Sequence, residues 1–263
     1  NGHSIDNIQI YENFEDGAGT DNAAAFFEYV GSNVIIKDLS LDGSIVSNGM
    51  YASGLIAHIV PDVSGGKANV TGCISDVSLN GSYEGDTTGY YGGLVADRHA
   101  DAAVNIEECA YRGKVTFAET SNLKFGGLIG ILDGKEYTSN SINYSYCTAQ
   151  YNSYVTGGSI VAEVADRQNV YGYKDVYYLN ALESVKYGTA LAIDKFTDGY
   201  LTYTYQNNDN TVTRWTQSIG TDDAPVLAYD GLNGSDKVHK ISFVYGNDVS
   251  AADYYGNEDM TLE

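Results

Sequence analysis

A short glycine-centred motif returns four times along the chain, and this repetition constrains the fold more than any other feature. Each copy joins a glycine pair, or a close variant of it, to aliphatic residues. The copies are Ser53-Gly54-Leu55-Ile56-Ala57, Gly92-Gly93-Leu94-Val95-Ala96, Gly126-Gly127-Leu128-Ile129-Gly130 and Gly157-Gly158-Ser159-Ile160-Val161-Ala162. With Gly54, Gly93, Gly127 and Gly158 as markers, the steps are 39, 34 and 31 residues. Self-similarity at such a period indicates stacked repeat units.

Three cysteines follow the same rhythm. Cys73, Cys109 and Cys147 are separated by 36 and 38 residues, and each comes just after a short strand-like stretch. We therefore expect them to stack as one ladder inside the protein, as small apolar groups. A reactive or intermolecular thiol is the alternative, because an odd number of cysteines cannot all pair within one chain.

The stretches between the motifs alternate apolar and polar residues over about four to eight positions, which is typical of half-buried strands. An earlier unit extends the array, because residues 38–43 match residues 76–81. One unit cannot close a core alone, so each must be covered by its neighbours. The sequence predicts an all-β fold, a right-handed parallel β-solenoid of roughly five coils over residues 1–180. Its units lie near residues 30–60, 70–97, 104–132 and 142–165.

The repeat fades beyond about residue 178. We expect residues 181–235 to form a β-rich C-terminal cap, because an uncovered last strand would pair with other chains. Within it, residues 182–196 are expected to contain one or two helical turns, and residues 199–205 and 211–219 to be strands. Residues 236–263 are expected to begin a small β module or a linker, with a strand at 241–245.

Charge excludes two classes of partner. The 263 residues include 35 acidic and 14 basic side chains, which gives a formal net charge of -21. Such a chain repels nucleic acid and anionic lipid. Because no apolar run approaches the roughly 20 residues of a membrane-spanning helix, we expect no membrane insertion in this part of the chain. We expect a monomer, cut from a longer parent because the chain begins within an apparent strand.

The glycine motif at 92–96 and 126–130, with Cys109-Ala110-Tyr111-Arg112-Gly113-Lys114-Val115 between them, resembles the GLUG-motif repeats of bacterial surface proteins. Residues 215–222, followed by Ala224-Pro225-Val226-Leu227, are similar to the tail that often follows such repeats. The resemblance implies a secreted or wall-attached bacterial protein whose repeats act as scaffold or adhesive stalk. Similar repeats occur in some immunoglobulin-cleaving metallopeptidases, outside their catalytic domains. The repeat itself carries no enzymatic residues.

Catalytic motifs are absent from the sequence. The histidines His3, His58, His99 and His239 never approach the His-Glu-x-x-His spacing, and neither a nucleophile elbow nor a phosphate-binding loop occurs. The charged run 97–101 is expected to be a solvated corner with a local ion pair, as is Asp166-Arg167. The alternative for 97–101 is a site at which His99, flanked by carboxylates, titrates near neutral pH. We therefore predict no catalytic residues. The alternative is a carbohydrate-active β-helix enzyme, since paired carboxylates are numerous.

Two further kinds of site remain. The oxygen-rich stretches 15–22 and 207–210 are expected to be turns stabilised by their own side chains, with a structural calcium ion as the alternative; no other cofactor is expected. Tyrosine, at 24 residues, is the better candidate for binding because its ring gives a large amphipathic contact. We predict a ligand-binding ladder on alternating strand positions, formed by Tyr171, Tyr173, Tyr177, Tyr203 and Tyr205. The alternative is that these rings only fill strands.

The sequence therefore predicts a non-catalytic extracellular module that acts as scaffold or adhesin and binds a host or matrix glycan or protein. A passive stalk that spaces another domain outward is the second alternative, beside the carbohydrate-active enzyme.

Overall fold

A computed structural model describes residues 2–15, 22–62, 66–98, 102–133, 139–165, 170–184, 186–207, 214–228 and 238. The chain divides into two compact units, Gly2–Ala190 and Leu191–Glu263. Within the described ranges, no helix has the length and apolar character needed to cross a membrane.

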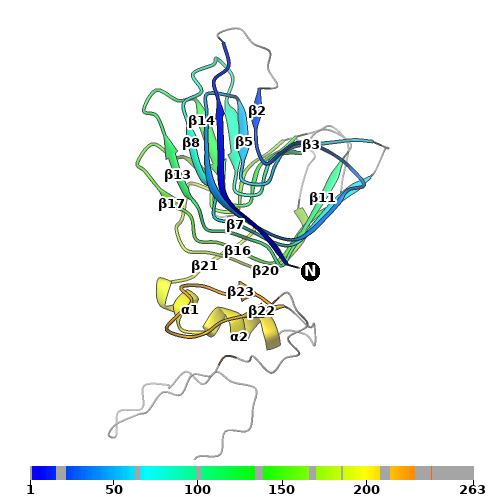
Figure 1. Ribbon diagram of the computed structural model, residues 1–263, viewed down its shortest axis with the longest axis vertical. Helices are drawn as coiled ribbons and strands as arrows, with labels where there is room; N and C mark the ends of the chain where they lie inside the picture. Colours follow the sequence, from blue (N-terminus) through cyan, green and yellow to red (C-terminus); the bar gives the residue numbers. More distant parts are fainter. Residues whose placement is uncertain are drawn as a thin grey trace, which may run out of the picture. The chain divides into compact units, whose positions relative to one another are not determined.

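The first unit is a parallel β-solenoid, which confirms the predicted architecture. Each coil contributes to three sheets, and the strands of one sheet lie side by side in successive coils (Figure 1). Sheet B contains, in spatial order, β18 (Gly157–Gly158), β14 (Leu123–Gly126), β9 (Gly89–Gly92), β5 (Tyr51–Ser53) and β2 (Ala23–Ala24). Sheet C contains β19 (Val161–Val164), β15 (Ile129–Leu132), β10 (Val95–Arg98), β6 (Ile56–Val60) and β3 (Phe27–Gly31). Four turns of the chain separate the five strands of each sheet.

Sheet A is the largest, with 11 strands. Its main order is β17 (Gln150–Tyr151), β13 (Lys114–Phe117), β8 (Ser78–Gly81), β4 (Ile35–Ser47), β7 (Lys67–Ser75), β11 (Ala103–Glu107), β16 (Asn140–Cys147), β20 (Val170–Tyr178) and β21 (Thr189–Ala190). Strand β1 (His3–Glu12) pairs with β4, and β12 (Ala110–Tyr111) pairs with both β7 and β16. The three sheets enclose one apolar core, to which each coil adds side chains such as Ile45, Val70 and Ile106.

The glycine motifs stack as predicted in the first three copies. Val95 pairs with Ile56 on one side and with Ile129 on the other, which aligns Gly54, Gly93 and Gly127. The fourth alignment was wrong by one residue. Gly126 pairs with Gly158, so Ser159 takes the place of the second glycine and the steps are 39, 34 and 32 residues.

The predicted match between residues 38–43 and 76–81 was also wrong, by four residues. Ser44 pairs with Ser78, and Ile45 pairs with Leu79. Both aliphatic side chains are fully buried. The register follows the buried column, whereas the similar Asp, Ser and Gly residues of the two segments stand at different places in their coils.

A left-handed residue recurs at one place in sheet A. Five successive coils have positive φ there: Asp38 (57°), Gly72 (62°), Glu108 (51°), Tyr144 (48°) and Asp175 (52°). Strand pairing on both sides of these residues aligns them in one column. This conformation bends each strand and interrupts the alternation of its side chains. Residues three apart across the bend, such as Val70 and Cys73, both join the core.

The cysteine ladder was predicted correctly for two of its three members. All three thiols are free and buried, and Cys73 lies against Cys109, with its backbone N–H 3.4 Å from the Cys109 Sγ. Cys147 instead pairs with Tyr111, two residues further along the coil. Ser145 continues the column, since the Cys109 backbone N–H donates to the Ser145 Oγ at 3.0 Å.

The described part of the second unit contains two helices, α1 (Ile193–Thr197) and α2 (Tyr200–Asn207), and an antiparallel pair, β22 (Trp215–Thr216) and β23 (Val226–Leu227). The helical turn predicted within 182–196 begins only at Ile193. The strand predicted at 199–205 was wrong. That segment is α2, because Leu201, Thr202 and Tyr205 recur at helical spacing and are buried together.

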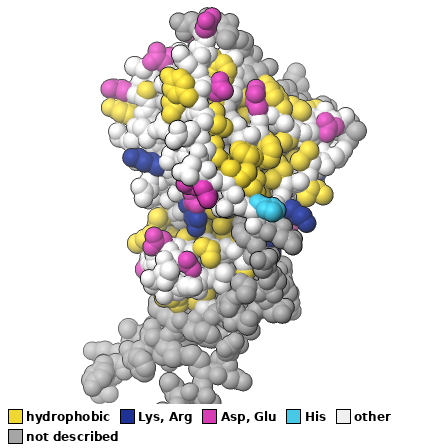
Figure 2. Space-filling model, viewed as in Figure 1, with side chains coloured by type: hydrophobic (Ala, Val, Ile, Leu, Met, Phe, Trp, Pro, Cys, Tyr) yellow, Lys and Arg dark blue, Asp and Glu magenta, His cyan; other side chains and the backbone are white. Residues whose placement is uncertain are grey.

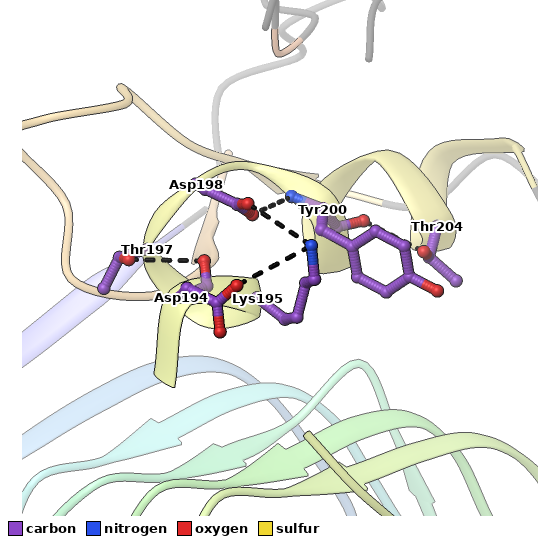
Figure 3. Close-up of polar contacts among 6 residues, drawn as sticks. All are labelled: Asp194, Lys195, Thr197, Asp198, Tyr200 and Thr204. Carbon is purple, nitrogen blue, oxygen red and sulfur yellow. Dashed lines mark hydrogen bonds and ion pairs between the residues drawn. The ribbon is translucent and has the colours of Figure 1, made fainter. Parts of the chain in front are cut away.

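Side-chain contacts fix the beginning of α2 (Figure 3). The Asp198 Oδ1 accepts a hydrogen bond from the Tyr200 backbone N–H at 3.0 Å, one of the N–H groups that have no partner within the helix at its beginning. The Lys195 Nζ lies 3.7 Å from carboxylate oxygens of Asp194 and Asp198 and 5.1 Å from the centre of the Tyr200 ring. These contacts join α1 to the first turn of α2.

The strand predicted at 241–245 and the module predicted at 236–263 lie outside the described residues, apart from Val238. The capping role of residues 181–235 stays a prediction.

Candidate functional site

The outer faces of sheets B and C meet at a corner, and their side chains touch there. The chain turns from sheet B into sheet C at each glycine motif, so strands of the two sheets follow each other closely. Tyr51 of sheet B contacts His58 of sheet C, with ring centres 4.8 Å apart. Lys124 of sheet B pairs with Glu163 of sheet C at 2.7 Å. We call this region the B–C corner; its members are Tyr29, Tyr51, His58, Tyr90, Asp97, Lys124, Ile131 and Glu163.

Two columns of stacked residues form the corner. Strand pairing stacks a column of sheet C in the order Tyr29, His58, Asp97, Ile131, Glu163. A column of sheet B stacks in the order Tyr51, Tyr90, Lys124. Hydrophobic side chains gather near β2, β3 and β5, and acidic side chains are scattered over the same face (Figure 2).

A buried pair of polar side chains lies in this corner. The His58 Nδ1 and the Asp97 Oδ2 are 3.0 Å apart, and the two residues are only 2% and 4% exposed. The Tyr29 ring stacks on the imidazole at 4.9 Å, with an angle of 18° between the planes. Tyr51 meets the same imidazole edge to face. The histidine is therefore held by one carboxylate and two aromatic rings.

Both members of the pair have a polar atom without a partner. The His58 Nε2 and the Asp97 Oδ1 are buried and make no hydrogen bond in the described structure. An ionised carboxylate only accepts, so we assign the hydrogen of a neutral His58 to Nδ1, which leaves Nε2 as an acceptor. Two acceptors of one buried pair thus lack donors, and such groups cost about 1–3 kcal/mol each when they stay unsatisfied.

The fold does not require polar residues at this place. Ile131 occupies the next position of the same column and is also buried, at 8% exposure. An aliphatic side chain therefore fits the column without any polar partner. Burial of a hydrogen-bonded charged group is no better for stability than a well-packed apolar residue. Local departures of this kind are expected at functional sites.

The other end of the corner is fully paired. The Glu163 carboxylate accepts hydrogen bonds from Lys124 and Tyr90. Burial opposes ionisation of Glu163, but these two hydrogen bonds outweigh it and hold the pKa of the carboxyl below its usual value. Burial, together with the bond to Glu163, raises the pKa of Tyr90, so its hydroxyl stays protonated and donates. Lys124 and Glu163 neutralise each other here.

The charged run 97–101 was wrongly predicted to be a solvated corner. Asp97 is buried against His58, and Arg98 is fully buried, with its Nη1 donating to the Ala102 backbone oxygen at 3.0 Å. Asp97 faces the B–C corner, whereas Arg98 pairs with Ile59 and Leu132 in a column whose aliphatic members belong to the core. Residues 99–101 and Asp166-Arg167 lie outside the described residues.

The tyrosines predicted to bind ligand do not form one face. Tyr173 pairs with Ile142 in a column that belongs to the core. Tyr177 stands between the core residues Val176 and Tyr178, so its ring points to the other face of the strand. The left-handed Asp175 between them places the two rings on opposite faces. Tyr173 is 55% exposed and contacts Tyr187, with ring centres 5.7 Å apart. The side chain of Tyr171 lies outside the described residues.

Tyr203 and Tyr205 belong to α2 in the second unit. Two residues apart on a helix, they point in different directions, so the predicted shared face was wrong here too. Tyr205 is fully buried and stacks on Trp215, with ring centres 5.6 Å apart. Tyr203 is half-buried.

The stretches considered for calcium fall largely outside the described residues, at 16–21 and 208–210. In the ranges that the structure does describe, no three His, Cys, Asp or Glu side chains are grouped closely enough to hold a metal ion.

The B–C corner was not predicted, although the sequence contains a signal for it. His58, Asp97, Ile131 and Glu163 each stand four residues after the second position of the glycine motif, once that position is taken as Ser159 in the last copy. Tyr51, Tyr90 and Lys124 each stand three residues before it. Aligned by the motif, the two columns could have been read from the sequence.

Comparison with known proteins adds a structural likeness. No family model and no curated protein matches the chain. The fold is similar to the crystal structure of a putative immunoglobulin A1 protease from Bacteroides ovatus, with a TM-score of 0.58 and 15% sequence identity. The match covers 86% of this chain and 75% of that one. At this identity the likeness shows the fold alone.

Proposed function

We propose that this chain is a non-catalytic extracellular module of a bacterial surface protein that binds carbohydrate at the B–C corner. One observation carries the proposal: aromatic rings and a buried His58–Asp97 pair with unsatisfied acceptors lie together at a place where the fold accepts isoleucine. Aromatic faces that pack on sugar rings, beside a few fixed polar groups, are typical of ligand sites. The resemblance to GLUG-motif repeats supports the extracellular setting.

A carbohydrate-active enzyme is the second candidate, and the same pair favours it. A carboxylate that holds the imidazole through Nδ1 leaves Nε2 in position to act as a base. A passive stalk without a ligand is the third. Each candidate gives a different result in one set of experiments with the intact chain.

The experiment is a glycan array probed with the purified chain, followed by calorimetry on the retained sugars. We expect retention at micromolar concentration, with no release of reducing ends or unsaturated products. Tyr29→Ala removes the half-exposed ring of the corner and should abolish retention, whereas Tyr173→Ala, a half-exposed ring on sheet A, should not. Absence of retention across the array would favour the stalk, and product release that is lost in His58→Gln would favour the enzyme.

A further inference from the structure

The unsatisfied atoms of the B–C corner define which sugars fit there. The His58 Nε2 and the Asp97 Oδ1 both accept hydrogen bonds in the assigned tautomer, and both lack donors. A ligand that satisfies them must offer O–H or N–H groups. A carboxylate or sulfate group offers only acceptors and would meet the Asp97 charge directly.

The charges of the corner also disfavour an acidic sugar. Its described members include the carboxylates Asp97 and Glu163, against a single lysine, Lys124, whose Nζ lies 2.7 Å from the Glu163 Oε2. Recruiting this lysine to an acidic sugar would break an existing ion pair and expose Glu163 to the ligand's own negative charge. The chain as a whole carries a net charge of -21, which repels polyanions at longer range.

Tyr29 is the most exposed side chain in contact with the pair. Its ring covers one face of the His58 imidazole, yet the residue is 51% exposed. Strand β3 is the edge strand of sheet C, so rotation of this side chain breaks no strand pairing. The two apolar faces that the movement opens, those of Tyr29 and Tyr51, can pack against the C–H groups of a pyranose ring.

We propose that the B–C corner selects a neutral pyranose whose hydroxyls donate to His58 Nε2 and Asp97 Oδ1 once the Tyr29 side chain moves to admit it. The inference rests on the proposed carbohydrate binding and specifies its substrate class. It excludes uronate, sialate and sulfated glycans as preferred ligands.

The test compares matched neutral and acidic probes on the whole chain. Mannohexaose and cellohexaose are the neutral hexose probes, and a galacturonic acid hexamer is compared with its methyl ester, which has the same backbone without charge. We expect at least one neutral probe to bind at least tenfold more tightly than the acid. Asp97→Asn, which replaces the free acceptor by a donor, should weaken that binding at least tenfold. Asp76→Asn, at a carboxylate between β7 and β8 of sheet A, outside the corner and paired with Arg112, should change it less than threefold.

A nuclear magnetic resonance titration keeps the test valid if Asp97→Asn fails to fold. The bound neutral probe should shift the His58 ring signals, assigned with His58→Gln, and leave those of the exposed His3 unchanged. Equal or tighter binding of the acid, or an unmoved His58 signal on binding, would overturn the neutral-sugar inference while leaving carbohydrate binding intact. Failure of the chain to bind any glycan would overturn the proposed function and the inference together.

Discussion

At the residue scale, the glycine motif is required because neighbouring backbone segments lie too close to leave room for a Cβ atom. A Cβ added at Gly126 would lie 1.7 Å from the Ile129 backbone oxygen and 2.7 Å from the Ala162 backbone nitrogen. Both obstacles are main-chain atoms of the same turn and of the adjacent coil, so no side-chain rotation removes them. Gly92 and Gly158 meet the corresponding Val95 and Val161 oxygens. The sharp turn between sheets B and C therefore depends on glycine here.

We predict that Gly126→Ala destabilises the protein by about 3 kcal/mol, because the overpacked backbone must shift. Gly172→Ala is the matched control: its added Cβ would lie 3.6 Å from the nearest atom, the Ser141 Cβ, an ordinary contact. Chemical denaturation of both variants measures the difference. Equal stability of the two would show that the turn relaxes easily and that the close approach does not hold the corner.

The buried thiols give a second prediction. Burial raises the pKa of Cys147 to about 11 and raises that of Cys109 as well, so both remain protonated thiols at neutral pH, the less reactive form. A chromogenic disulfide reagent should modify all three cysteines over hours in the native protein and at once in denaturant. Ser139→Cys, at an exposed position, should add one rapidly reacting thiol. Rapid native modification of Cys73, Cys109 and Cys147 would contradict their burial.

Residues that define the candidate site were harder to predict than residues that define the core. The sequence identifies His58 and Asp97 only as single polar residues 39 positions apart, and Asp97 stands next to Arg98, which favours a local ion pair. Their contact follows from the register between coils. The glycine motif sets that register, but a polar residue four positions after it can face solvent or a corner, and only the packing of Tyr29 and Tyr51 distinguishes these cases.

At the element scale, one left-handed residue per coil decides which side chains face inward. Alternation predicts that Tyr173 and Tyr177 share a face, and Asp175 reverses this. Nothing in the local composition signals the bend, because the five residues of this column are of four different kinds. In α2, the tyrosines favour a strand by propensity, whereas the hydrogen bond from Tyr200 to Asp198 and the burial of Leu201 with Tyr205 favour a helix.

The ion pair between β14 and β19 gives a prediction at this scale. Lys124→Met should destabilise the protein by about 0.5 kcal/mol at neutral pH, a modest value because both side chains are 39% exposed. The pKa of Glu163 is lowered in the folded state, so its contribution is present above the unfolded value of about 4.3 and is lost as the pH falls through the folded value. Denaturation at neutral and acidic pH measures this difference between wild type and variant. When both proteins also carry Glu163→Gln, the difference in stability between them should no longer depend on pH.

At the scale of the whole molecule, the solenoid was predictable because each repeat contains glycine and aliphatic residues that must stack on the equivalent residues of the next coil. The boundaries of a coil were less predictable. Loops of variable length shift recognisable sequence motifs by one to four residues relative to the true register, without changing the stacked core. The second unit of the chain lacks the repeat, and its helices were accordingly the elements least accessible to sequence reasoning. Stacked units of this kind contact their neighbours above and below, so stability is expected to be approximately additive over coils.

This additivity leads to a deletion experiment. Removing residues 93–126 joins Gly92 to Gly127 and takes out one complete coil, because Gly126 stacks on Gly92 and Ile129 takes the place of Val95. In the shortened chain β16 would pair with β7 in the register that β11 uses now, since Asn105 pairs with both Asn69 and Ser141. We expect a β-type circular dichroism spectrum and cooperative unfolding at a lower temperature. A control deletion of residues 93–109 removes about half a coil and misaligns every column in the coils that follow. This variant should not fold. If the full-coil deletion unfolds as completely as the control, the coils are not exchangeable units, and packing specific to one coil must hold the solenoid together.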